Sequence, residues 1–108
     1  MPSITVLVNS RVPGYTAKAL AMVEAATSKA VMDIEGRAKG RSPVDTGNLK
    51  NSIQGSMTGR TEGRVDAGAE YAVFVEFGTY KMGAQPYLIP ATEEVVPAFK
   101  AAIAAAVR

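Results

Sequence analysis

The tripeptide Asp45-Thr46-Gly47 is the stretch of this sequence whose residue types most directly suggest catalysis. In aspartic proteases an Asp-Thr-Gly turn supplies one of two carboxylates that share a proton, held about 3 Å apart. The length of 108 residues is also close to that of a retroviral-type protease subunit, which works as a homodimer. A homodimeric aspartic protease that uses Asp45 is therefore one hypothesis for this chain.

The residues around the tripeptide favour a structural role instead. A protease turn must follow a buried apolar strand, whereas residues 36–43 form the basic end of a helical pattern and a turn directed by Pro43. The polar continuation after Gly47 also differs from the apolar one in that class. Asp45 or Thr46 can instead cap a short helix over residues 47–52. We expect a cap and turn built from the following residues: Pro43, Asp45, Thr46, Gly47 and Leu49.

Composition excludes several kinds of site. The chain has no Cys and no His, so it cannot form a disulfide, a Cys nucleophile, a Ser-His-Asp triad or a zinc site of the usual kind. We therefore expect no catalytic residue, no metal and no cofactor. With 47% apolar and 20% charged residues, the sequence has the profile of a globular protein. It has no apolar run of the ~20 residues that span a bilayer, and its first residues do not resemble a signal peptide, so we expect no membrane contact.

Periodicity predicts the secondary structure. Residues 16–39 are rich in Ala, and apolar residues recur there at steps of three and four, which indicates a long helix that Gly40 could end. Residues 91–108 indicate a second helix, in which Pro97 lies either in the first turn or at a kink. Residues 4–8 indicate a strand, and residues 53–68 indicate a β-hairpin whose polar tip covers residues 58–64.

The remaining segments are less regular. The apolar run over residues 70–79 is compatible with helix or strand, and we favour a short helix that Gly78 ends. Gly83, Pro86 and Pro90 indicate an irregular loop over residues 80–90. The sequence thus predicts one α+β domain over residues 1–108, with a long N-terminal helix and a C-terminal helix packed on a small antiparallel sheet that includes an extended β-hairpin.

Three ordered motifs together resemble a known family. They are SPVDTGNLKNSI at residues 42–53, YAVFVEFGT at residues 71–79 and AQPYLIPA at residues 84–91. In this order and spacing they resemble the HK97 gp10-like tail-component family of tailed bacteriophages, over roughly residues 17–105. The resemblance implies a non-enzymatic structural protein of the virion, assembled in the host cytoplasm.

The resemblance also implies a place in the particle. It suggests a tail-completion or head–tail joining protein that forms a homo-oligomeric ring, most plausibly a hexamer, in the neck. The expected neighbours are the head-connector protein and a tail-terminator or tail-tube protein. The subunit interface is expected among residues of the second and third motifs and the loop between them: Tyr71, Glu76, Phe77, Gly78, Tyr80, Met82, Gln85, Pro86 and Tyr87.

Some of these residues have a second interpretation. Aromatic residues anchor interfaces, but Phe74, Phe77 and Tyr87 could instead pack the core, and we favour core packing for Phe74 and Phe77. Glu76 lies in an apolar run, so it could pair with a basic group, cap backbone N–H groups or be exposed to solvent.

Basic residues motivate a third function, a small DNA-binding module. The net charge is only +2, but basic residues gather around the first motif and continue into the hairpin. An evenly solvated rim is the simpler interpretation of this pattern. Because DNA passes through a phage neck, we also consider that Arg60 and Arg64 face DNA in the lumen, through non-specific phosphate contacts.

Overall fold

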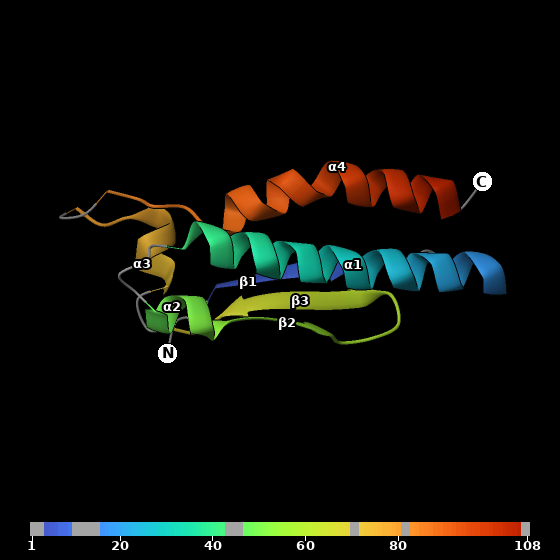
Figure 1. Cartoon of the computed structure of the whole chain (residues 1–108), viewed down its shortest axis with the longest axis horizontal. Coiled ribbons are helices and arrows are strands. Elements are labelled where there is room, and N and C mark those ends of the chain that lie inside the picture. Colours follow the sequence, from blue (N-terminus) through green and yellow to red (C-terminus); the bar gives the residue numbers. More distant parts are fainter. Residues whose placement is uncertain (1–3, 10–15, 43–46, 70–71, 81–82, 107–108) are drawn as a thin grey trace.

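The computed structural model describes residues 4–9, 16–42, 47–69, 72–80 and 83–106, and it has the predicted α+β architecture (Figure 1). Long helices lie against a small three-stranded antiparallel sheet, and the chain measures 51 × 23 × 20 Å along its principal axes. The elements in chain order are β1 (Ile4–Asn9), α1 (Ala17–Arg41), α2 (Gly47–Ser52), β2 (Ile53–Met57), β3 (Glu62–Ala67), α3 (Ala72–Phe77) and α4 (Leu88–Ala106).

Helix α1 begins and ends at residues that suit its termini. Thr16 is the N-cap, and its hydroxyl oxygen accepts a hydrogen bond from the N–H of Ala19 at 3.1 Å. The helix continues past Gly40, its predicted end, to Arg41. Ser42 is extended (φ −64°, ψ 143°), the geometry that a following proline such as Pro43 imposes, so it is the proline that stops the helix.

The sheet has the order β1-β3-β2, with the predicted hairpin formed by β2 and β3. Alternate residues point to opposite faces. Val8, Ile53 and Val65 point to the buried face, which α1 covers. The other face is largely polar: Thr5 of β1 donates a hydrogen bond at 2.6 Å to Asp66, its partner on β3. The sheet therefore has one core face and one solvated face.

Two glycines let α1 approach the hairpin closely. A Cβ atom built on Gly63 would lie 2.5 Å from a methyl carbon of Val31, and one on Gly55 would lie 2.8 Å from the other methyl carbon. Beside them, the backbone N–H of Gly55 donates to the Glu35 carboxylate. The long helix is thus seated on the sheet by backbone proximity as well as by apolar side chains.

Helix α4 lies along α1 rather than across the sheet (Figure 1). It begins at Leu88, three residues before the predicted start, because Pro90 falls in the first turn, where backbone N–H groups have no partner within the helix. Pro97 lies inside the helix and not in its first turn, so of the two predicted alternatives the one with a longer helix is confirmed. Glu94 of α4 forms ion pairs with Arg37 and Arg41 of α1. Of the helices described, none has the length and hydropathy that crossing a membrane would require.

We expect the substitution Gly63→Ala to lower the free energy of unfolding by about 1–3 kcal/mol, because the added methyl group collides with Val31 and with the backbone oxygen of Ser56. Gly36→Ala is the control: nothing lies within 4 Å of the added atom in that helix, so it should stabilise the protein by about 0.5–1 kcal/mol. Urea unfolding of both variants measures the difference. A Gly63→Ala variant as stable as the wild type would contradict the close packing.

Candidate functional site

The carboxylate of Glu76 holds the start of α4. Glu76 lies in α3 with only 2% of its surface exposed. Its Oε1 accepts hydrogen bonds from the backbone N–H groups of Tyr87 at 3.1 Å and Leu88 at 2.8 Å, and its Oε2 accepts one from Ile89 at 3.2 Å. These donors have no acceptor within α4, and the positive end of the helix dipole favours a negative charge there. Of the roles considered for Glu76, the structure shows the capping of backbone groups.

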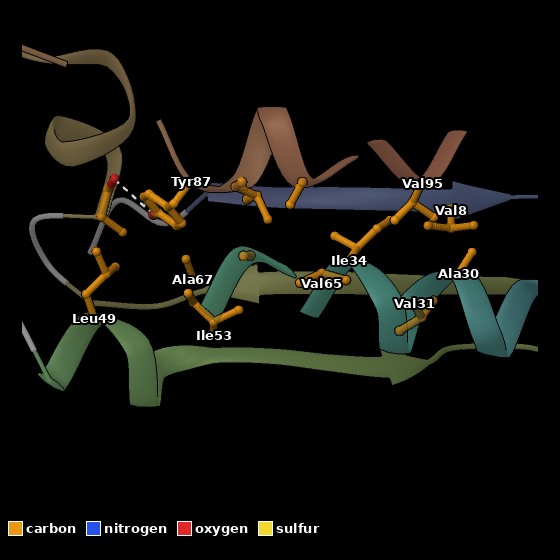
Figure 2. Packing of buried hydrophobic residues seen from close by; sticks show 14 of the residues in the cluster. Val8, Ala30, Val31, Ile34, Leu49, Ile53, Val65, Ala67, Tyr87 and Val95 are labelled. Carbon is orange, nitrogen blue, oxygen red and sulfur yellow. Dashed lines mark hydrogen bonds between the residues drawn. The ribbon is translucent and has the colours of Figure 1, made fainter. Parts of the chain in front are cut away.

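Tyr87 adds a second link between α3 and the start of α4, in which α3 supplies the acceptor through its backbone rather than through a side chain. Its side chain is fully buried, and its hydroxyl donates a hydrogen bond at 3.1 Å to the carbonyl oxygen of Ala72 in the first turn of α3 (Figure 2). The N–H of Gln85 also donates to the carbonyl oxygen of Val75 at 2.8 Å. Bonds from three positions thus fix α3 against the segment that enters α4.

Helix α3 ends as predicted at Gly78. This glycine has a positive φ of 79°, the left-handed conformation that favours glycine after a helix, and its N–H donates to the carbonyl oxygen of Phe74 at 2.7 Å. The chain therefore turns sharply after Phe77. This turn leaves the aromatic side chains on either side of it at the end of the molecule where α3 lies.

Burial raises the pKa of the Tyr87 phenol well above its usual range, and the neighbouring Glu76 carboxylate raises it further. Both causes disfavour the phenolate, since the anion would lose water and would face a second negative charge. Tyr87 therefore stays neutral and continues to donate its proton to Ala72 over the whole physiological range.

Three aromatic side chains form an exposed surface on and after α3, which we call the aromatic ridge. Phe74 is 48% exposed, Phe77 is 59% exposed and Tyr80 is 93% exposed. The expected core packing of Phe74 and Phe77 is therefore wrong. Helix α3 buries one side only, with Ala72, Val75 and Glu76, and the two phenylalanines, three residues apart, share the other side.

The remaining residues predicted for the subunit interface are divided between surface and core. Gln85 and Pro86 are exposed and Gly78 is half-buried, so these residues are accessible on the single chain. Glu76 and Tyr87 are buried, so they would influence a neighbour through the residues that they position. Tyr71 and Met82 lie outside the described residues. Whether any of these residues contacts another subunit stays a prediction.

The predicted cap and turn is described only in part. Pro43, Asp45 and Thr46 lie outside the described residues, whereas Gly47 is the first residue of α2, at the predicted boundary. Leu49 of α2 is fully buried in the core (Figure 2). The elements on both sides of Asp45 are helices, α1 and α2, and not the buried strand that should precede a protease turn. In the part of the chain that the structure describes, no three His, Cys, Asp or Glu side chains gather as a metal site would need.

The two arginines considered for DNA contact both have carboxylate partners. Arg60 lies at the hairpin tip and pairs with Glu24 of α1 at 3.2 Å. Arg64 lies not at the tip but within β3, on the solvated face of the sheet, where it pairs with Asp66 at 2.9 Å. Both pairs are partly exposed to solvent and bring negative charge next to each arginine, which weakens a phosphate-binding surface.

Comparison with known families supports one of these interpretations. Residues 10–78 match the profile of the family described as the bacteriophage HK97-gp10 tail component. The chain belongs to this family. The match covers more than half of the sequence and includes the first motif and nearly all of the second. Membership identifies the chain as a structural component of bacteriophage tails, and so of the virion. Searches of curated proteins and of solved structures gave no match.

The matched range ends before several residues of the site. It includes Glu76 but not Tyr87, so the third motif of the sequence lies beyond it. The capping of α4 by Glu76 was not predicted specifically, although a signal exists. Pro86 and Tyr87, which precede α4, are poor N-cap residues, so an acceptor from elsewhere in the chain is required.

We expect Glu76→Ala to lower the free energy of unfolding by roughly 3 kcal/mol, because it removes a cap and leaves buried N–H donors without an acceptor. Glu76→Gln should have a smaller effect, since the amide keeps one acceptor oxygen. The control is Glu93→Ala, at an exposed position of α4, which should change stability by less than about 0.5 kcal/mol. Equal effects of Glu76→Ala and Glu93→Ala in urea unfolding would show that the cap contributes nothing.

The raised pKa of Tyr87 predicts a pH dependence of stability. Since the folded-state pKa is raised above the unfolded value of about 10, the stability that this group contributes is fully present below pH ~10 and is lost as the pH rises further. Tyr87→Phe should cost about 1 kcal/mol near neutral pH through loss of the hydrogen bond. The difference between wild type and variant should then shrink above pH ~10. Unfolding curves that keep a constant difference across this range would contradict the assignment.

Proposed function

We propose that the chain is a ring-forming tail-completion or head–tail joining protein of the phage neck, and that it has no enzymatic role. Family membership supports a structural tail component. The observation that carries the finer proposal is the aromatic ridge: Phe74 and Phe77 on the rigidly held helix α3, and Tyr80 shortly after it, are exposed to solvent. A monomer gains nothing from three exposed aromatic residues at one end, whereas aromatic side chains are common anchors of subunit interfaces.

The rigidity of the ridge supports this role. Helix α3 is only six residues long and would be marginal alone. The Glu76 carboxylate and the Tyr87 hydroxyl fix it to α4 before any partner arrives. An interface element that is already ordered loses less conformational entropy on association. The expected neighbours in the particle are further copies of this chain, which form a hexamer with it. The head-connector protein and a tail-terminator or tail-tube protein are the other expected neighbours.

Neither alternative function gains support from a specific observation. The protease hypothesis needs Asp45 on a turn that follows a buried strand, and the helix α1 precedes it instead. The DNA-binding hypothesis needs accessible cations on one face. Arg60 and Arg64 lie on different parts of the hairpin, and each is paired with a carboxylate.

Deletion of the gene tests the proposal. Particles of the source virus that lack the protein should show filled or empty heads and tails that are not joined, and the wild-type gene should restore joined particles. Phe77→Lys, which places a charge on the ridge without disturbing the core, should fail to restore them. Met32→Lys is the matched control, because Met32 is 69% exposed on α1 and does not belong to the ridge.

Two results would contradict the proposal. Normal, tailed and infectious particles from the deletion would rule out the neck function itself. Full restoration by a stably folded Phe77→Lys variant would rule out the ridge as its contact surface. Electron microscopy of the particles, together with urea unfolding of the purified variants, separates these results from a folding defect.

A further inference from the structure

An apolar groove lies between β1, α1 and α4. Helix α4 packs mainly on α1, so it leaves a gap of about 260 Å³ beside β1, one of the two edge strands of the sheet. The groove borders the core, because three of its lining residues, Val8, Ile34 and Val95, also belong to the buried hydrophobic cluster drawn in Figure 2. The walls include Val6 and Leu7 of β1 and Val96 and Phe99 of α4. Leu7 is 76% exposed, and the alternation along β1 places its side chain with that of Thr5 on the solvated face of the sheet.

The chemistry of this groove suits an apolar side chain rather than a cofactor or metabolite. It is smaller than the roughly 300–1,000 Å³ of common ligand pockets. The hydroxyl of Thr92, one of its few polar groups, is already hydrogen-bonded to the carbonyl oxygen of Leu88. Lys100 supplies one charge to the lining and lies on the exposed side of α4. Asn9, another polar residue of the lining, already donates a hydrogen bond to Glu62 at 3.4 Å, so among the described residues of the groove few polar groups are left to orient a polar ligand.

The aromatic ridge is chemically complementary to this groove. From Ala72 to Tyr80 the only charged residue is Glu76, which is buried and engaged by α4. The exposed side chains of Phe74 and Phe77 can therefore enter an apolar site without the cost of removing a charge from water. The ridge and the groove are both exposed to solvent on the single chain. Docking of one in the other would remove the apolar area of both from water.

The ridge and the groove lie on different parts of the molecule. Helix α3, which carries Phe74 and Phe77, lies at one end of the molecule (Figure 1), whereas the α4 residues that line the groove come from the middle of that helix. We propose that the aromatic ridge of one copy of this chain docks in the β1–α4 groove of the next copy. Such a contact joins unlike surfaces head to tail, and contacts of this kind form a closed ring when the rotation between neighbouring copies closes. This inference rests on the proposed function, to which it adds the acceptor surface of the ring contact.

Disulfide cross-linking in assembled particles tests the inference. The wild-type chain has no cysteine, so any disulfide between two copies must come from the introduced residues. One chain carrying Phe77→Cys and another carrying Val96→Cys are produced together in the deletion strain. A disulfide forms only where Cβ atoms come within about 4.5 Å. We expect a mixed dimer that contains one chain of each kind, identified by mass spectrometry after mild oxidation, and a second mixed dimer from Tyr80→Cys with Val6→Cys.

The controls give each alternative a distinct result. Met32→Cys with Val96→Cys should give no mixed dimer, because Met32 lies outside the ridge. Dimers formed by Val96→Cys alone or by Phe77→Cys alone would show like surfaces meeting across a two-fold axis and would overturn the inference. Joined particles that contain the protein but give neither mixed dimer would also overturn it, and would leave the proposed neck function standing.

Discussion

The surface that we assign to assembly depends on one buried carboxylate. Glu76 accepts hydrogen bonds from three successive backbone N–H groups at the start of α4, although it belongs to a different helix. A buried carboxylate without such donors would be strongly unfavourable, and a helix start without an acceptor would leave its N–H groups unpaired. Each of the two therefore requires the other, and together they fix α3 at the beginning of α4.

The rest of the molecule holds α4, and therefore α3, in a fixed position. Helix α4 is anchored along α1 by apolar packing and by the ion pairs of Glu94 with Arg37 and Arg41. Helix α1 is in turn held close to the hairpin by Gly55 and Gly63. Because the short helix α3 is hydrogen-bonded to the start of α4, and α4 is packed on α1, α3 is held in place by the two long helices. Its outward side carries Phe74 and Phe77 of the aromatic ridge, while its inward side contributes Ala72 and Val75 to the core.

Much of this architecture could be predicted from local patterns, because it depends on residues close in sequence. The long helix followed from apolar residues such as Val23 and Ile34 at helical spacing, and the hairpin followed from its glycines. The exposure of Phe74 and Phe77 could not be predicted in this way. A short apolar run has no periodicity that separates an inner from an outer side. Capping was one of the roles considered for Glu76, but its partner escaped prediction, because the cap joins Glu76 to Leu88, a contact that only the tertiary fold creates.

Hydrogen exchange at the start of α4 tests the central claim most directly. If the Glu76 carboxylate holds the N–H groups of Leu88 and Ile89 in the folded protein, these amides should exchange as slowly as amides in the middle of α1. The first N–H groups of an uncapped helix would instead exchange at the rate of an exposed loop. Slow exchange in the wild type that becomes fast in Glu76→Ala would establish the account, and fast exchange in the wild type would contradict it.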